Sequence, residues 1–582
     1  MAGPKTLPFT EKKTMQNALP ARADQPIESR PGLPGLVLPQ TSLWGNLEVS
    51  AHRYPDKAGI RYFGKSTSFR ELHAQATALA GWLQQKGGVK KGDRVLLYMQ
   101  NCPQFIVSYY AILRADAVVV PVNPMNRAEE FRHYVTDAGA RAAICSADLA
   151  CVVERATGEL APADRLQHLL VTAYADALPS SHEFAEDTPP AWLTTSHPWP
   201  AGATPWTEAL GASLLPGPHT AGPDDMAVMP YTSGTTGFPK GCIHTHRSVM
   251  QSVVGGRAWY DSRPESASLS VLPLFHVSGM QHGMNVPIYS GATVVMLPRW
   301  DREVAGRLIS RHRITHWTCN PTMVVDFLAS PNVAELDLSS LQHIGGGGAA
   351  MPEAVADRLR GTLGLSFLEG YGLSETMAAT HVNPAARPKL QCLGLPTSNL
   401  DARVVDPVTL KELPPNEIGE IIVSGPQVFK GYWGKDDATR DAFVEFEGKT
   451  FFRTGDLGRM DGEGYYFITD RLKRMINASG FKVWPAEVEN LLYKHPDVQE
   501  ACIIGTRDPY RGETVKAVVV LCAHAKGKTT PEDIIEWAKE NMAAYKYPRT
   551  VEFVEVLPKS GTGKVMWREL QEAENAQAVA GG

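Results

Sequence analysis

The segment best suited to chemistry runs from Tyr231 to Gly241 and reads YTSGTTGFPKG. Six consecutive residues in it are glycine, serine or threonine, so its backbone is free to curl round phosphate oxygens, and Lys240 adds a positive charge. Most stretches of this composition are surface loops, but the appended Pro-Lys-Gly favours a triphosphate loop. The residues predicted to bind the nucleotide here are Thr232, Ser233, Gly234, Thr235, Thr236 and Lys240.

This loop is not a Walker A motif. Gly234 and Gly237 lie too close together, and Lys240 follows proline rather than glycine. The Gly-Lys-Thr sequence at Gly448 also fails, because Phe443 stands where that motif requires glycine.

A second candidate nucleotide segment, EGYGLSET, begins at Glu369. Tyr371 offers an aromatic face for a purine, the Ser374 hydroxyl suits a phosphate, and Glu375 offers a hard oxygen ligand for the magnesium that accompanies ATP. Alone, such a sequence is more often a helix cap after a strand. Its place downstream of the phosphate loop favours nucleotide binding instead, through Glu369, Gly370, Tyr371, Gly372, Ser374, Glu375 and Thr376.

Two further segments suit the rest of a nucleotide. Asp456, in TGD, is a carboxylate that can bond both hydroxyls of a ribose, and Arg471, in DRLK, can reach the same sugar or a phosphate. The simpler reading is a turn aspartate and a solvated arginine. Four glycines from Gly345 to Gly348 form only a weak dinucleotide fingerprint, but they permit the close approach of a base, chiefly at Gly347 and Gly348.

The elements that must position these residues follow an α/β pattern. Before residue 220, apolar stretches such as RVLLYM, AVVVPV and RAAICS alternate with helical segments such as SFRELHAQATALAGWLQQKG. Residues 176–223 are rich in proline, serine and threonine, which predicts an irregular excursion. A second sheet-rich part follows from Asp225, and near Asp470 the pattern changes to short strands and helices (EACIIGT, KAVVVLCA, EDIIEWAKENMAA). We expect a domain boundary there.

Composition limits the classes of function. A chain of 582 residues exceeds one ordinary hydrophobic core, so we expect several domains in a soluble protein. The net charge of -5 gives no basic field for nucleic acid. Eight scattered cysteines without a CxxC pair fit reduced thiols, and no run is apolar enough to span a membrane or to act as a signal peptide, which predicts a cytoplasmic protein. Residues 1–40 are predicted to form an extended arm.

Together the motifs resemble the adenylate-forming superfamily, in its acyl-CoA synthetase or fatty-acid–CoA ligase branch. Besides the two segments above, the chain carries FFRTGDLGRMDGEGYYFITDRLKRMI from Phe451, GFKVWPAEVE from Gly480 and PKSGTGKVMWREL from Pro558, all in the family's order. The resemblance implies a large layered α/β domain over 41–472 and a mobile α+β lid over 473–582. It further implies an AMP-forming ligase that uses ATP, magnesium and coenzyme A, and it is compatible with a homodimer.

The resemblance also assigns residues that composition alone would not. Lys564, in SGTGK, would be the catalytic cation between the carboxylate and the α-phosphate, while Lys473 falls on the family's hinge and Gly480 on the loop that the rotated lid brings to the site. His276 falls beside the acid carboxylate and the pantetheine tunnel. Thr235 joins Glu375 as a predicted magnesium ligand.

The acid is least determined. Family relatives suggest a fatty acid. Five residues are polar or bulky for a hydrophobic acyl tunnel: Ser278, Gln281, His282, Trp317 and Asn320. They leave room for a short, branched or hydroxylated acid such as 2-hydroxyisobutyrate. Three alternatives share the motifs: a free-standing adenylation enzyme that loads a carrier protein, a luciferase-type oxygenase, and a non-catalytic regulatory protein that keeps the fold.

Overall fold

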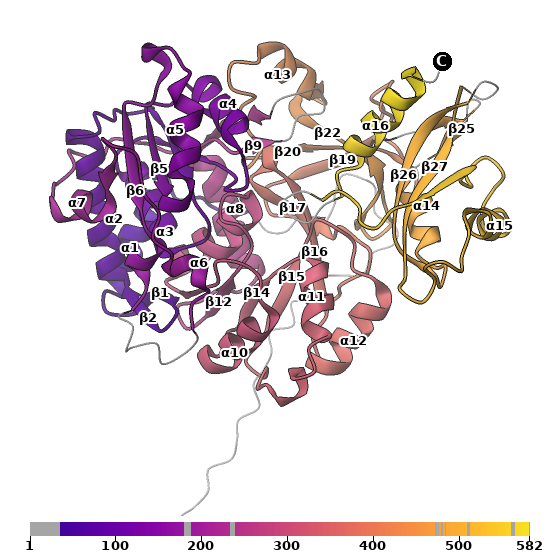
Figure 1. The fold of residues 1–582 in the computed structure, drawn as a ribbon, viewed down its shortest axis with the longest axis horizontal. Helices are drawn as coiled ribbons and strands as arrows, with labels where there is room; N and C mark the ends of the chain where they lie inside the picture. Colours follow the sequence, from indigo (N-terminus) through magenta and orange to yellow (C-terminus); the bar gives the residue numbers. More distant parts are fainter. Residues whose placement is uncertain are drawn as a thin grey trace, which may run out of the picture. The chain divides into compact units, whose positions relative to one another are not determined.

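The computed structural model describes residues 35–179, 188–232, 239–471, 474, 476–478, 481–483, 485–508, 512–559 and 565–580. Figure 1 labels the helices and strands along the chain. Most of the predicted arm, residues 1–34, lies outside these ranges. Its described end is fixed to the fold, since the amide nitrogen of Leu36 donates to Asn399 Oδ1 at 2.9 Å and Asn399 Nδ2 donates to the Leu36 carbonyl at 2.9 Å.

The first sheet is mostly parallel and has the strand order β11-β8-β4-β3-β5-β6-β7. Its centre is almost entirely apolar, as expected for parallel strands covered on both faces. The helix α3 (Pro103–Arg114) is buried over nearly its whole length, so it forms core rather than surface. The strands are β3 (Arg94–Tyr98), β4 (Val118–Pro121), β5 (Ala142–Ser146), β6 (His168–Thr172), β7 (Thr204–Pro205), β8 (Met226–Val228) and β11 (His244–Thr245), and the flanking helices include α2 (Phe69–Gln85), α4 (Ala128–Ala138) and α5 (Ala150–Gly158).

The second sheet has nine strands in the order β18-β17-β16-β15-β14-β12-β13-β1-β2. Its middle strands are parallel, and antiparallel strands complete both edges. The strands are β1 (Ala58–Tyr62), β2 (Lys65–Ser68), β12 (Ala267–Ser270), β13 (Thr293–Met296), β14 (His316–Thr318), β15 (His343–Gly346), β16 (Phe367–Leu373), β17 (Ala378–Val382) and β18 (Leu395–Pro396).

Different helices belong to the two faces of this second sheet. One face packs into an apolar core with α10 (Arg302–His312), α11 (Pro321–Leu328) and α12 (Glu353–Leu363), which Figure 1 shows beside β12, β14, β15 and β16. The other face meets α8 (His246–Trp259), the seven-residue π-helix η5 (Gly279–Asn285) and α9 (Val286–Ser290). A π-helix is rare and is frequently found at functional sites, which makes this second face a candidate for binding a ligand.

A five-stranded antiparallel sheet follows, with the order β19-β20-β22-β21 and β23 paired to β22. Its strands are β19 (Asp401–Val405), β20 (Gly419–Ser424), β21 (Phe443–Phe446), β22 (Lys449–Met460) and β23 (Tyr466–Arg471). The short helix α13 (Asp436–Ala442) precedes β21.

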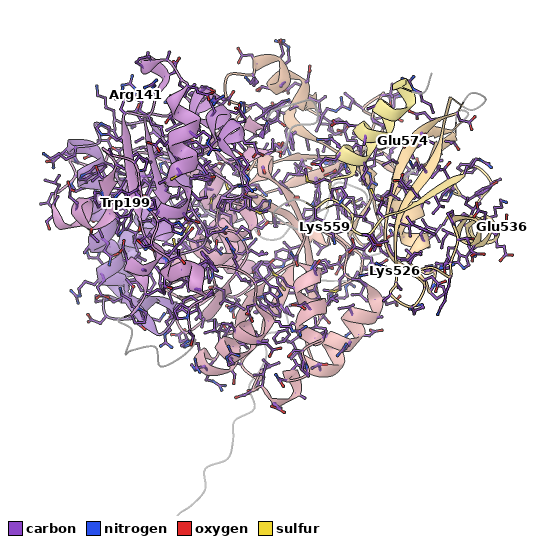
Figure 2. All side chains as sticks on the ribbon, in the orientation of Figure 1. Arg141, Trp199, Lys526, Glu536, Lys559 and Glu574 are labelled. Carbon is purple, nitrogen blue, oxygen red and sulfur yellow. The ribbon has the colours of Figure 1, made fainter. Side chains whose placement is uncertain are left out.

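The C-terminal part has its own sheet and its own core. Its longest pair is the antiparallel hairpin of β26 (Val498–Asp508) and β27 (Gly512–Leu521), joined by β24 (Ile476–Ala478), β25 (Phe481–Val483) and β28 (Thr550–Phe553). Its helices are α14 (Pro485–Leu492), α15 (Pro531–Asn541) and α16 (Trp567–Ala580). Glu574 on α16, labelled in Figure 2, accepts a hydrogen bond from Lys516 Nζ at 2.6 Å and so ties this helix to β27.

The predicted fold class is confirmed, with a large N-terminal α/β domain and a smaller C-terminal domain. The segments quoted as strands and helices in the sequence form β3, β4, β5, β26, β27, α2 and α15. The prediction of an irregular excursion over 176–223 was too simple, because the described part of it holds α6 (Ala191–Thr194), the edge strand β7 and α7 (Trp206–Gly211). Among the described residues, no helix is long and apolar enough to cross a membrane.

Candidate active site

The two ends of the phosphate loop are held together by a small hairpin. Strand β9 (Tyr231–Thr232) pairs antiparallel with β10 (Lys240–Gly241), which sets Thr232 opposite Lys240. The predicted Ser233, Gly234, Thr235 and Thr236 lie between them, outside the described residues. The base of the loop is therefore fixed by backbone pairing, with Lys240 at its end.

Helix α4 braces this base from the first sheet. His133 Nε2 lies 2.8 Å from the carbonyl oxygen of Pro239, and since a carbonyl only accepts, that nitrogen carries the proton. The Tyr231 hydroxyl donates to Asp137 Oδ2 at 2.9 Å, and Lys435 Nζ lies 3.1 Å from Asp137 Oδ1. Sequence reasoning missed these residues, because nothing in 128–138 marks them as partners of a segment that lies so much later in the chain.

A tyrosine links the predicted lysine and the predicted metal ligand. Lys240 Nζ lies 5.0 Å from the centre of the Tyr432 ring, and the Tyr432 hydroxyl donates to Glu375 Oε1 at 2.9 Å. Burial and the neighbouring Glu375 carboxylate raise the pKa of Tyr432, so its phenol stays protonated and donates. The side chains of Lys240, Tyr432 and Glu375 form what we call the phosphate-end cluster; Tyr432 was not predicted.

The phosphate-end cluster suits a magnesium ion that arrives with a nucleotide. Glu375 is 8% exposed and supplies a carboxylate, the kind of hard oxygen ligand that Mg²⁺ prefers. In the described ranges no group of three His, Cys, Asp or Glu residues could hold a metal by itself. Proteins that bind nucleotides with Mg²⁺ usually hold the ion through one or two carboxylates together with the phosphates of the nucleotide. The residues present therefore fit the ion.

The predicted base and ribose residues are in direct contact. The Tyr371 hydroxyl donates to Asp456 Oδ2 at 2.5 Å, and Asp456 is completely buried. Rings pack in series beside Tyr371, with His381 at 5.8 Å and Tyr466 4.4 Å from His381, centre to centre. Arg471 pairs with Asp456 across β22 and β23 through the backbone. Residues from two sheets thus meet where a nucleoside was predicted.

The EGYGLSET turn is held in an uncommon backbone conformation. Met377 and Ala378, directly after it, have φ values of 48° and 81°, which side chains other than glycine seldom adopt. The Thr376 hydroxyl is buried and bonds Leu373 and Ala378, and the Ser374 carbonyl accepts from His244 Nε2 at 2.8 Å. Thr376 was predicted to bind the nucleotide, but its hydroxyl is used within the turn.

Glu369 is likewise engaged by the fold. Its carboxylate accepts from the backbone nitrogens of Gln391 at 2.7 Å and Met351 at 3.4 Å, and burial raises its pKa to about 7. Two of the predicted glycines are required by close backbone contacts: a Cβ at Gly347 would lie 2.2 Å from the Gly370 carbonyl oxygen, and one at Gly372 would lie 1.8 Å from that of Ala378. Gly348 has a φ of 95°, in the region that favours glycine.

The residues predicted to surround the acid lie in different parts of the structure. His276 is half-buried just before η5, and its Nδ1 accepts from the Ser278 amide at 3.3 Å. The Trp317 ring stacks on Trp300 at 5.6 Å in the apolar core of the opposite face, and Trp317 is also among the residues that line a small cavity on the π-helix face. Asn320 caps α11 through the Met323 amide.

Three predicted residues of the mobile lid and hinge, Lys473, Gly480 and Lys564, lie outside the described residues, and nothing is described of the Arg471 side chain. Their roles, like those of the other predicted site residues, stay predictions.

Comparisons with known proteins show which family the chain belongs to. The family model "AMP-binding enzyme" matches residues 47–433, and the model "AMP-binding enzyme C-terminal domain" matches residues 487–564. Both the phosphate-end cluster and the Tyr371 site fall within the first match, while Asp456 lies between the two.

Relatives cover nearly the whole chain. It is 36% identical over 567 residues to a long-chain-fatty-acid–CoA ligase of Bacillus subtilis (strain 168), covering 96% of this chain and 99% of the relative. It is 32% identical over 526 residues to a feruloyl-CoA synthase of an Amycolatopsis species, covering 90% and 96%. Among solved structures, ATP-bound MatB from Rhodopseudomonas palustris superposes with a TM-score of 0.80 at 27% identity, covering 92% of this chain and 100% of that one. The chain belongs to the AMP-binding enzymes of the adenylate-forming superfamily, in the acyl-CoA synthetase branch.

Proposed function

We propose that this enzyme joins a carboxylic acid to coenzyme A in two steps. The acid first attacks the α-phosphate of ATP and releases pyrophosphate, and the thiol of coenzyme A then displaces AMP from the mixed anhydride. The single observation that supports this best is the pairing of the phosphate-end cluster with the Tyr371–Asp456 contact, because a triphosphate and its nucleoside require such sites together. The activities named for the relatives support it as well.

Each side chain has a proposed task. Lys240 and the loop residues Thr232, Ser233, Gly234, Thr235 and Thr236 would bind the phosphates, with Ser374 beside them. Glu375, held by Tyr432, and Thr235 would bind the magnesium ion, which neutralises phosphate charge when bound. Asp456 and Arg471 would hold the ribose, and Tyr371, with the Gly347 and Gly348 backbone, would lie along the base.

The acid and the lid complete the mechanism. Attack by a carboxylate on a phosphate brings two anions together, so a cation placed between them lowers the barrier. We propose Lys564 as that cation and His276 as the residue beside the acid. Rotation about Lys473 would then bring Gly480 to the site for thioester formation.

We propose the division already expected from the sequence: an arm over 1–40, the nucleotide and acid domain over 41–472 and the lid over 473–582. Both family matches fall inside the corresponding domain. We also propose the cytoplasm as the compartment, because all eight cysteines are free thiols and six of them are buried.

The direct test measures two products. Pyrophosphate release and acyl-CoA formation are followed with ATP, Mg²⁺, coenzyme A and a panel of acids that varies in length, branching and polarity. We expect both products in equal amounts with at least one acid. Pyrophosphate without a thioester, together with acyl transfer to a carrier protein, would favour the adenylation enzyme that loads a carrier. No release of pyrophosphate with any acid would favour the non-catalytic alternative.

A further inference from the structure

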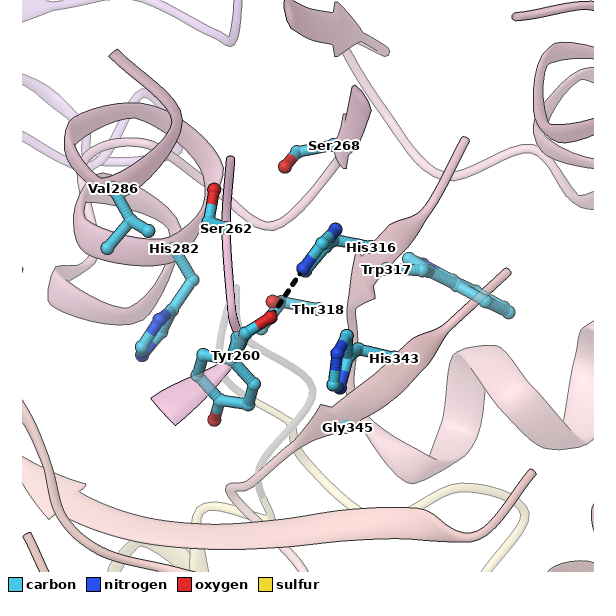
Figure 3. Close-up of a pocket in the computed structure, with 10 residues that line it drawn as sticks. All are labelled: Tyr260, Ser262, Ser268, His282, Val286, His316, Trp317, Thr318, His343 and Gly345. Atoms are coloured by element: carbon cyan, nitrogen blue, oxygen red, sulfur yellow. Dashed lines mark hydrogen bonds between the residues drawn. The ribbon is translucent and has the colours of Figure 1, made fainter. Parts of the chain in front are cut away.

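A small cavity lies on the π-helix face of the second sheet (Figure 3). Its volume is about 20 Å³, and three histidines, His282, His316 and His343, line it together with Tyr260 and Ser262. By this measure it holds about one water molecule. A long alkyl tail therefore has no room here without rearrangement.

The floor of the cavity is polar because of strand register. Ser268 on β12 pairs with His316 on β14, and His316 pairs with His343 on β15, so these three side chains form a row on one face. Their neighbours Trp317 and Ile344 belong to the apolar core of the other face. The alternation thus buries apolar side chains on one side of the sheet and presents histidines to the cavity on the other.

His316 is fixed by the fold. Its Nε2 donates to the carbonyl oxygen of Tyr260 at 2.7 Å, and its Nδ1 lies 2.7 Å from the Thr315 hydroxyl. Burial lowers its pKa to about 4, so the ring is neutral. The His343 ring stacks on it with the centres 4.9 Å apart and an angle of 28° between the planes. His316 thereby sets the position of His343.

Other polar atoms round the cavity have no partner within the described chain. His282 Nδ1, His343 Nδ1 and the Ser262 hydroxyl are buried without a hydrogen bond. Leaving a buried polar atom unpaired costs about 1 to 3 kcal/mol, so such atoms normally meet a polar ligand or water. Three of them round one cavity indicate that it takes a water molecule or a single oxygen atom of a ligand.

A second cavity of about 20 Å³ adjoins the first and shares Tyr260 and His282 with it. It follows α8 past Ser252 and Gly256 and is bordered by Ala379, just beyond the EGYGLSET turn. The second cavity thus borders both the histidine cavity and β17, the strand that follows the turn carrying Glu375.

The charge of the lining residues further limits the chemical class of the ligand. None of the ten residues that line the histidine cavity is lysine or arginine. An ionised group buried there would lack a counter-charge, which is strongly unfavourable. The lining therefore favours an uncharged oxygen of the acid, such as a hydroxyl or a carbonyl, over a second carboxylate group on the same acid.

Resting on the proposed ligase function, we infer that the acid is compact and carries a hydroxyl or carbonyl oxygen, and that this oxygen occupies the cavity in place of a water molecule, where His282, His343 and Ser262 bind it. The carboxylate of that acid would remain toward the nucleotide. Unsubstituted long-chain acids would leave the polar atoms unpaired and would not fit.

The test compares matched acids. We measure kcat/KM for acids of four to six carbons with and without a hydroxyl or oxo group, and for dodecanoate. For the native enzyme we expect the oxygenated acid to exceed its unsubstituted match by about tenfold or more. His343→Leu and His282→Leu should each reduce that ratio at least severalfold, while His168→Leu, on the first sheet, should leave it unchanged.

The results that would contradict this inference differ from those that would contradict the ligase function. If plain acids are converted as well as oxygenated ones, or if rates rise with chain length up to dodecanoate, the inference fails although the ligase function stands. If no acid yields thioester, both fail. Should the leucine variants not fold, His343→Asn and the ranking of acids by the native enzyme decide the question.

Discussion

Replacing Tyr432 with phenylalanine tests the phosphate-end cluster most directly. The change removes one hydroxyl and keeps the ring, so the 5.0 Å approach of Lys240 Nζ to the ring is retained. What is lost is the 2.9 Å hydrogen bond to Glu375 Oε1. A hydrogen bond to a charged group contributes roughly 1.5 to 3 kcal/mol, and Glu375 is too buried for water to replace it freely.

That energy corresponds to a fall of about 10- to 100-fold in kcat/KM for ATP if Glu375 must be oriented when the metal and triphosphate bind. Pyrophosphate release is measured against ATP at fixed Mg²⁺ and against Mg²⁺ at fixed ATP, and the Mg²⁺ concentration for half-maximal rate should rise. Tyr465→Phe is the matched control, since Tyr465 is buried and its hydroxyl likewise donates one hydrogen bond, to the backbone carbonyl of Arg387 at 2.8 Å. If Tyr432→Phe leaves both dependences as in the native enzyme, Tyr432 does not position Glu375 for catalysis.

Three further outcomes are expected. EDTA should abolish adenylation, and Glu375→Gln should raise the magnesium requirement; a full rate without any divalent ion would contradict the metal assignment. Lys564→Ala should slow adenylation by roughly 10² or more yet convert supplied acyl-AMP and coenzyme A at a near-normal rate; equal slowing of both steps would show an effect on binding or folding. Glu369 has a folded-state pKa of about 7, above its usual 4.5, so its ionisation destabilises the fold as pH rises from 4.5 through 7, by about 3 kcal/mol at most. The melting temperature of Glu369→Gln minus that of the native enzyme should therefore be larger at pH 8 than at pH 5. An equal difference at both pH values would refute the raised pKa.

Local patterns predicted individual elements well. The helix α2 begins at Phe69, after Ser68, whose side chain caps it together with Glu71, and the apolar runs of β3, β4 and β5 are those of buried parallel strands. The site motifs were equally local, since each segment contains its own glycines and hydroxyls. The roles assigned to Lys240, Glu375 and Asp456 stay predictions, although the structure brings Lys240 to Glu375 through Tyr432.

Contacts between distant segments could not be predicted. The strands β1 and β2, at the start of the chain, join the second sheet beside β13, more than two hundred residues later. The face on which the Trp317 ring lies depends on strand register, which one sequence does not determine. The histidine row arises in the same way: His316 and His343 become neighbours only once β14 and β15 pair.

The brace from helix α4 has a consequence for how this protein can be divided or recombined. Because His133 and Asp137 hold Pro239 and Tyr231, the position of the phosphate loop depends on two segments about a hundred residues apart. A fragment that starts after β7 would keep every residue of the loop motif and lose the clamp at its base. Exchanges of segments between relatives should therefore carry 128–138 and 231–241 as one inherited unit, with Trp433 and Lys435, which also contact Asp137, exchanged alongside them.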